Sequence, residues 1–234
     1  MSAGDDAGRT ESRIRGRALR SLLNDLSSAA ISHTSVLPPG SLHAESPSDT
    51  GWMIFRSTDE EIAIAPVLPL QGAAEREGFI ADQLLAQLES RPTTAIVLVR
   101  LGRYAVGVFR GTELVSSKTE TRYVGSQHKA GGWSQKRFAR IREKQIRELF
   151  DKVCETARDK LSPYESDIER LWLGGDRYVL NGLLERCRWL NRFSEQTADY
   201  RLNVPTPDLA GLKKSIEDAL AYRVIRTSTY SAEP

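Results

Sequence analysis

Residues 94–124, TAIVLVRLGRYAVGVFRGTELVSSKTETRYV, contain the clearest secondary-structure signal in the chain. The run at 94–101 is apolar and rich in β-branched residues, and further strand-like runs follow at 104–110 and 113–124. Only Gly102-Arg103 and Gly111-Thr112 separate these runs, and such tight turns pair each strand with the next. The stretch therefore predicts a three-stranded antiparallel meander.

The rest of this half alternates between helical and strand-like patterns. Apolar residues recur at helical spacing in three segments, 134–160, 178–190 and 207–223. Two shorter segments, 169–173 and 200–204, have strand composition. The predicted order is βββαβαβα, a mixed α/β sheet covered by helices, which is the order of ribonuclease-H-like domains.

The amino-terminal part of the chain shows weaker patterns. From it we expect a disordered tail at 1–13, helices at 14–31 and 73–88, a loop at 33–50, and short strands at 51–55 and 61–66. Together with the downstream pattern, these elements predict four parts: the tail at 1–13, an extension at 14–90, the ribonuclease-H-like domain at 91–225, and a second tail at 226–234.

Composition limits the classes of protein to consider. The 234 residues are 40% hydrophobic and 27% charged, which is typical of a globular protein. No stretch approaches the roughly 20 apolar residues of a membrane helix, and the first ten residues lack the apolar core of a signal peptide. We expect a cytoplasmic, monomeric protein without a membrane segment. The two cysteines, Cys154 and Cys187, lie among apolar residues at helical spacing and predict reduced core residues.

Charge is distributed unevenly along the chain. The net charge is only +2, but residues 122–147 carry +7, with Glu143 as their only acid, and the remaining residues carry −5. One basic segment on an otherwise acidic chain is typical of a polyanion-binding surface. The alternative is a solvated, charged helix face.

Several other chemistries lack the residues they need. The three histidines, His33, His43 and His128, are scattered and do not have zinc-ligand spacing. The first strand of the meander contains no Asp or Glu, so the carboxylates of a two-metal nuclease are missing. Ser126–Lys129 matches Ser-x-x-Lys, but its companion motifs are absent. We expect neither a metal nor a cofactor.

Residues 125–142, GSQHKAGGWSQKRFARIR, combine glycines, glutamines and basic residues. Gly125, Gly131 and Gly132 give the backbone freedom or allow its close approach to another molecule. Gln135 or Gln127 can orient a water molecule, because an amide both donates and accepts hydrogen bonds. The residues expected to bind RNA are Lys129, Trp133, Lys136, Arg137, Arg140, Arg142, Lys144 and Arg147.

The run GGWSQKRFARIREKQ resembles the GGQ loop and following helix of eukaryotic and archaeal class-1 release factors, whose middle domain has the same strand and helix order. The matching residues are Gly131, Gly132, Ser134, Arg137, Phe138, Arg140 and Arg142. Trp133 stands where those factors have their catalytic glutamine, and Gln135 follows two positions later. A displaced glutamine is similar to the release-factor-like peptidyl-tRNA hydrolases of ribosome-associated quality control, especially their bacterial branch.

This resemblance implies that the protein hydrolyses the peptidyl-tRNA ester on stalled large ribosomal subunits. Gln135, or alternatively Gln127, would position water in the peptidyl-transferase centre, and the partners would be ribosomal RNA and peptidyl-tRNA. Trp133 would pack the loop onto the domain or stack on RNA. Two other readings stay open: a non-catalytic, pelota-like module that binds ribosome or tRNA, and a tRNA nuclease.

Overall fold

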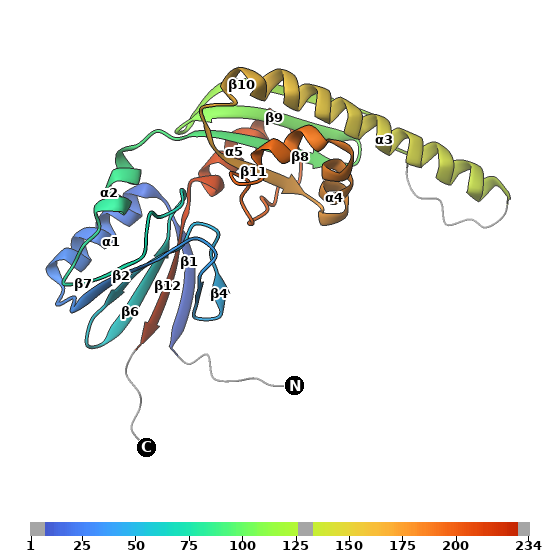
Figure 1. The fold of residues 1–234 in the computed structure, drawn as a ribbon. Coiled ribbons are helices and arrows are strands. Elements are labelled where there is room, and N and C mark those ends of the chain that lie inside the picture. Colours follow the sequence, from blue (N-terminus) through green and yellow to red (C-terminus); the bar gives the residue numbers. More distant parts are fainter. Residues whose placement is uncertain (1–7, 126–132, 229–234) are drawn as a thin grey trace. The chain divides into compact units, whose positions relative to one another are not determined.

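The computed structural model describes residues 8–125 and 133–228 (Figure 1). Backbone contacts divide them into two compact units. The first unit contains the described residues up to Ser90 together with those from Leu220 onward, and the second contains Arg91–Ala219. The carboxyl-terminal end of the chain thus belongs with the amino-terminal unit, whereas the sequence pattern placed residues up to 225 in the downstream domain.

The second unit is built on a four-stranded mixed sheet in the order β10-β9-β8-β11. The predicted meander is present as β8 (Thr93–Arg100), β9 (Arg103–Arg110) and β10 (Glu113–Thr121), with antiparallel pairing throughout. β11 (Ile168–Gly175) pairs in parallel with β8. The mixed α/β class predicted from the sequence is confirmed.

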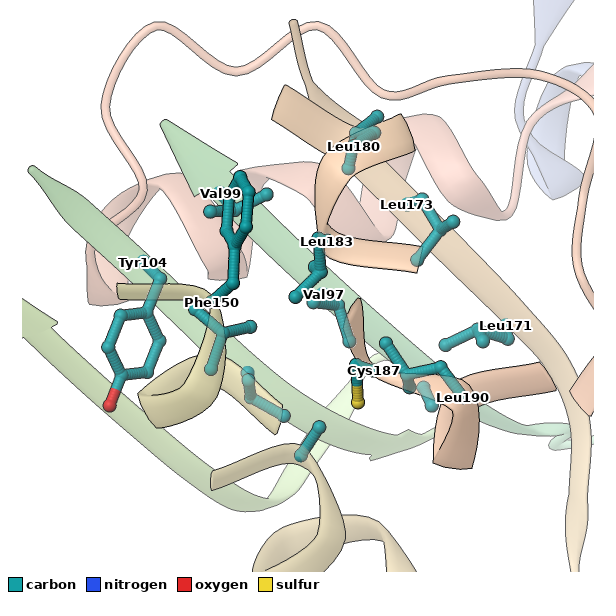
Figure 2. Packing of buried hydrophobic residues seen from close by; sticks show 14 of the residues in the cluster. Val97, Val99, Tyr104, Phe150, Leu171, Leu173, Leu180, Leu183, Cys187 and Leu190 are labelled. Atoms are coloured by element: carbon teal, nitrogen blue, oxygen red, sulfur yellow. The ribbon is translucent and has the colours of Figure 1, made fainter. Parts of the chain in front are cut away.

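Helices cover both faces of this sheet. They are α3 (Trp133–Leu161), α4 (Arg177–Arg186) and α5 (Leu209–Ala219), with 3₁₀ turns at Ser162–Tyr164 and Arg188–Phe193. On one face, alternate strand residues such as Val97 and Leu171 pack against Phe150 of α3 and Leu183 of α4 (Figure 2). α5 contacts the opposite face, where Leu212 lies over Gly107. Both faces of β8 are buried, which explains its nearly continuous apolar sequence.

Two predicted elements of the second unit are wrong. Residues 200–204 do not form a strand: only Leu202 bridges to Gly174, and its N–H donates to the Leu173 carbonyl oxygen over 2.9 Å. Pro205 and Pro207 follow directly and cannot donate backbone hydrogen bonds, so the ladder stops there. The predicted helix at 207–223 ends at Ala219, because the residues after it join the other sheet.

The first unit contains a six-stranded antiparallel sheet in the order β1-β12-β6-β5-β2-β7. Its strands are β1 (Arg9–Ile14), β2 (His33–Leu37), β5 (Trp52–Arg56), β6 (Glu60–Ala65), β7 (Ala74–Glu77) and β12 (Tyr222–Ser228). The unit also has helices α1 (Gly16–Ser28) and α2 (Asp82–Glu89) and a small hairpin formed by β3 (Leu42–His43) and β4 (Ser46–Pro47).

Several expectations for this unit are wrong, and one long-range pairing explains two of them. Residues 9–13 were expected in a disordered tail, and 226–228 in a second tail, but β1 and β12 pair with each other. The predicted loop at 33–50 contains β2, β3 and β4. The predicted helix at 73–88 is interrupted at Gly78, whose φ of 76° is incompatible with a right-handed helix, so a strand precedes it and a shorter helix follows.

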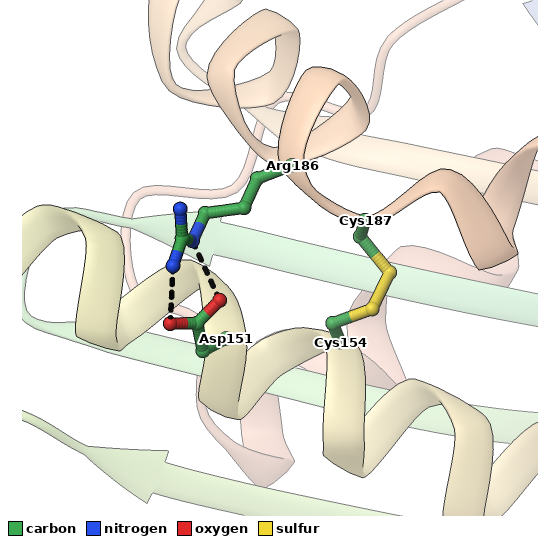
Figure 3. The surroundings of a disulfide bond; sticks show 4 residues. All are labelled: Asp151, Cys154, Arg186 and Cys187. Carbon is green, nitrogen blue, oxygen red and sulfur yellow. Dashed lines mark hydrogen bonds and ion pairs between the residues drawn. A yellow bond between two sulfur atoms is a disulfide. The ribbon is translucent and has the colours of Figure 1, made fainter.

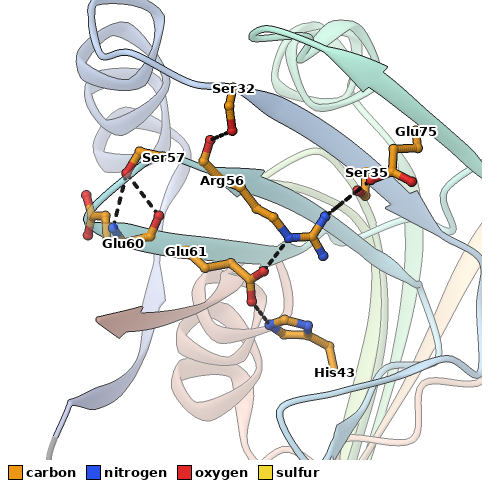
Figure 4. Close-up of polar contacts among 8 residues, drawn as sticks. All are labelled: Ser32, Ser35, His43, Arg56, Ser57, Glu60, Glu61 and Glu75. Atoms are coloured by element: carbon orange, nitrogen blue, oxygen red, sulfur yellow. Dashed lines mark hydrogen bonds and ion pairs between the residues drawn. The ribbon is translucent and has the colours of Figure 1, made fainter. Parts of the chain in front are cut away.

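A polar network lies on one face of the first unit's sheet (Figure 4). Arg56 on β5 donates from Nε to Glu61 Oε2 over 2.7 Å and from Nη1 to Ser35 Oγ over 2.8 Å. His43 Nε2 lies 3.3 Å from Glu61 Oε1. Burial lowers the pKa of His43, and the nearby Glu61 carboxylate opposes this shift only in part. His43 is therefore held as a neutral imidazole near pH 7.

The cysteine prediction is also wrong. Cys154 on α3 and Cys187 at the end of α4 form a disulfide, with their Cα atoms 5.4 Å apart (Figure 3). Cys187 is buried in the apolar core, and Cys154 is partly buried and packs against it. Their apolar surroundings agree with the helical spacing in the sequence. That spacing placed each cysteine inside the fold but carried no information about their proximity, since 33 residues separate them.

Candidate nucleic-acid interface

The amino-terminal part of α3 projects beyond the sheet that supports the rest of the helix (Figure 1). α3 has 29 residues and is therefore about 43 Å long. Among its described side chains, which begin at Lys136, every residue up to Ile141 is exposed, and the first buried one is Ile146. The helix is thus exposed on all sides over residues 136–141, between one and two turns, instead of presenting one solvated face there.

This projecting segment is strongly basic. Residues 136–147, here called the basic segment, carry a net charge of +5, with Glu143 as their only acid. The predicted RNA-binding residues whose side chains are exposed in this segment are Lys136, Arg137, Arg140, Lys144 and Arg147. An isolated helix with this composition has little apolar surface to bury. Its surface fits a polyanion such as an RNA backbone.

Two apolar side chains on the basic segment were not assigned a role by sequence reasoning. Phe138 is 50% exposed and Ile141 is 43% exposed, three residues apart on the same side of the helix. Their exposure could not be anticipated from periodicity, because an apolar pair at this spacing is usually part of the core. These two side chains add exposed apolar surface between the charges of the basic segment.

The end of the meander is fastened to α3 at Gly125. The Gly125 N–H donates to Oε1 of Gln145 over 2.9 Å, and the Gly125 carbonyl oxygen accepts from Nε of Arg142 over 3.0 Å. Arg142 was expected to bind RNA, but its Nε is used within the protein. Sequence reasoning missed Gln145, and no pattern in the sequence relates it to Gly125.

The structure does not describe every predicted site residue. Gln127, Lys129, Gly131 and Gly132 lie outside the described residues. α3 begins at Trp133, so Gln135 occupies the third position of the helix, although the described side chains begin one residue later. The glycine pair therefore directly precedes the helix that carries the basic segment.

The carboxylates at the two ends of β11 are engaged in structural contacts. Glu169 Oε1 accepts a hydrogen bond from the Thr93 N–H over 3.0 Å, and Asp176 Oδ2 lies 3.5 Å from Nη1 of Arg100. Within residues 8–125 and 133–228, no group of three His, Cys, Asp or Glu side chains is placed to hold a metal ion.

No helix in the part of the chain that the structure describes is both long and apolar enough to span a membrane.

The chain is similar in sequence to known peptide chain release factors. Peptide chain release factor subunit 1 of Picrophilus torridus is 26% identical over 184 residues, which are 74% of this chain and 45% of that protein. The same factor of Aeropyrum pernix is 35% identical over 143 residues, 60% of this chain and 38% of that protein. The chain thus spans less than half the length of these curated relatives. By its similarity to them it is one of the release-factor-like proteins.

The particular family follows from a match to a family sequence model. The model described as Actinobacteria/chloroflexi VLRF1 release factor matches residues 92–225, more than half of the chain, and the chain belongs to this family. The resemblance to a bacterial release-factor-like branch is confirmed by this match.

Two solved structures show the extent of structural similarity. The archaeal translation termination factor aRF1 is 18% identical, with a TM-score of 0.45, over 88% of this chain and 70% of that chain. The Vms1 mitochondrial localization core is 16% identical, with a TM-score of 0.47, over 73% of this chain and 74% of that chain.

Proposed function

We propose that this protein hydrolyses the peptidyl-tRNA ester on stalled large ribosomal subunits and so releases the nascent peptide. The observation that carries the proposal is the projecting basic segment of α3. The helix itself begins directly after a Gly-Gly pair. Membership of a release-factor family supports the same general role.

The basic segment accounts for binding to RNA. Its exposed cations follow three turns of a helix that projects from the domain, so phosphates can approach from several sides. The first turn of α3 contains no acidic residue, and the positive end of the helix dipole adds to the attraction of phosphate. Each phosphate contact releases condensed counterions, so binding falls steeply as salt rises.

Gln135 accounts for the chemistry. Its amide orients a water molecule whose oxygen attacks the ester carbonyl carbon, while the bond between that carbon and the ribose oxygen of the tRNA breaks. One water proton passes to the ribose oxygen, and the products are a peptide with a free carboxyl group and deacylated tRNA. Orientation and stabilisation of the developing oxyanion are sufficient in this mechanism because the ester is already reactive, so no metal or cofactor is needed.

The test measures peptide release from large subunits that carry labelled peptidyl-tRNA. We expect wild type to release the peptide and Gln135→Ala to lower the rate at saturating protein by about 100-fold or more, as when a transition-state hydrogen bond is removed. Gln127→Ala is the matched control and keeps the wild-type rate. Both variants should bind the subunit as wild type does.

Binding without release by the wild type would contradict this mechanism. The protein would then be a rescue module that binds the ribosome without hydrolysis, as Trp133 at the position of the class-1 release factors' catalytic glutamine allows. Loss of release in Gln127→Ala but not in Gln135→Ala would move the catalytic role to the other glutamine.

A further inference from the structure

We infer that Gln145 is a positioning residue for release: together with Arg142 it ties the strand end at Gly125 to α3 and so braces the helix that carries Gln135 in its first turn. The inference rests on the proposed function. We call these three residues, Gly125, Arg142 and Gln145, the Gly125 clamp.

The clamp uses both backbone polar groups of Gly125. The N–H donates to Gln145 Oε1 over 2.9 Å, and the carbonyl oxygen accepts from Arg142 Nε over 3.0 Å. Arg142 and Gln145 are three residues apart and therefore face the same side of the helix. Because the two bonds hold opposite sides of one residue, Gly125 cannot turn without breaking at least one of them.

Gly125 takes part through its backbone and not through its lack of a side chain. A Cβ atom built on Gly125 would lie 3.5 Å from Gln145 Oε1 and 3.8 Å from the Tyr123 hydroxyl, which is ordinary contact. Alanine therefore fits at this position and leaves both clamp bonds in place. Proline removes the N–H and with it the bond to Gln145.

The clamp lies between the body of the domain and the start of the helix. Arg142 and Gln145 are nine and twelve residues from Trp133, or about 14 and 18 Å along the helix axis. On the strand side, the Arg122 N–H donates to the Gly102 carbonyl oxygen over 2.8 Å, and Val124 packs against the apolar core. Without the clamp, the last fixed point on the strand side moves back from Gly125 to Val124.

The clamp is not part of the core. Both Arg142 and Gln145 are partly exposed, and the buried residues of α3 begin after them, at Ile146. Loss of the clamp should therefore loosen the tie between the strand end and α3 while leaving the folding of the second unit intact.

The experiment compares Gln145→Leu, which cannot accept the hydrogen bond, with Gln145→Glu, which keeps an acceptor oxygen at the same distance along the side chain. Gln145→Glu is therefore the matched control for Gln145→Leu. Single-turnover peptide release is measured against protein concentration, so that the rate at saturation and the half-saturating concentration are obtained separately.

We expect Gln145→Leu to lower the saturated rate about 2- to 13-fold, the range for loss of one net hydrogen bond. The half-saturating concentration should change less than 2-fold, because the exposed cations of the basic segment are intact. Gln145→Glu should release at a rate close to wild type. A merely structural role would instead lower the thermal midpoint of Gln145→Leu without this split between rate and binding.

Amide hydrogen exchange at Gly125 gives a second readout that does not need activity. Protection of this amide in wild type and in Gln145→Glu, and its loss in Gln145→Leu, would support the clamp. A Gln145→Leu variant that releases peptide as fast as wild type, or a Gly125 amide that exchanges equally fast in both, would overturn the inference. If wild type releases no peptide, the proposed function fails, and exchange alone then decides whether the clamp exists.

Discussion

Cys154 and Cys187 join α3 to the end of α4 by a disulfide, and an ion pair lies directly beside it (Figure 3). Asp151, one turn earlier on α3, accepts two hydrogen bonds from Arg186, at 2.5 Å from Nε and 2.7 Å from Nη2. The helix held by these contacts is the one that carries the basic segment. The two contacts therefore fasten the base of the candidate interface to the domain.

Reduction of the disulfide should lower the stability of the second unit. A cross-link that closes a loop of this length contributes about 3–4 kcal/mol to the free energy of unfolding by restricting the unfolded chain. Cys154 lines an open groove of about 870 Å³, so a reductant can reach it. Urea unfolding with and without dithiothreitol measures the change, and a Cys154→Ala/Cys187→Ala variant serves as a control that should not respond to reductant. Identical unfolding midpoints for oxidised and reduced wild type would contradict the prediction.

The stability of the first unit should depend on the protonation of His43. Burial lowers the pKa of His43 below its usual 6.5, so the unfolded chain binds a proton more readily than the folded protein does. The stabilisation is therefore complete above pH 6.5 and decreases as the pH falls from there through the lowered pKa. Unfolding of wild type and His43→Gln between pH 7.5 and 5 measures this effect, and the variant should show the smaller slope. Equal slopes for the two proteins would show that His43 does not contribute.

Gly175→Ala should strongly destabilise the second unit. Gly175 has a φ of 135°, and a Cβ atom at this position would lie 2.0 Å from the carbonyl oxygen of Val99. Backbone strain alone costs about 1–3 kcal/mol, and the clash adds to it. Gly102→Ala is the matched control: its φ is 95°, but the nearest backbone atom is 3.6 Å from the added Cβ. Thermal unfolding should therefore show a clearly larger loss for Gly175→Ala, and equal losses would rule out the clash as the cause.

Arg140→Ala should weaken binding to large subunits in a salt-dependent manner. Arg140 is exposed on the basic segment, and removal of one phosphate contact lowers the slope of log affinity against log salt by about one. Arg177, exposed at the start of α4, provides a control outside the basic segment. Binding isotherms between 50 and 200 mM salt give both slopes. The prediction fails if Arg140→Ala keeps the wild-type slope or if Arg177→Ala loses as much.

Much of the second unit could be predicted because its signals are local. The apolar run of β8 and the glycine turns after β8 and β9 specify a meander through neighbouring residues alone. The first unit depends on pairing between the two ends of the chain, since β1 contacts β12 more than 200 residues later. Local periodicity contains no information about such a pairing, so both strands were assigned to tails and to the end of a helix.

The candidate site divides in the same way. The basic segment and the Gly-Gly pair could be found from the sequence, because charge and motif are properties of consecutive residues. The contacts of Gly125 with Arg142 and Gln145 join a strand end to a helix about twenty residues downstream, and only the fold shows them. The same is true of the disulfide: the sequence predicted that both cysteines lie in the core but not that they are bonded to each other.

The most direct test of the central claim is to identify the products formed when the protein acts on large subunits carrying peptidyl-tRNA. Hydrolysis of the ester predicts a peptide with a free carboxyl group and a tRNA whose 3′ end is intact and can be charged again. A peptide that still carries tRNA nucleotides, with a correspondingly shortened tRNA, would contradict ester hydrolysis and identify the protein as a nuclease. Stable binding with neither product would contradict any catalytic role.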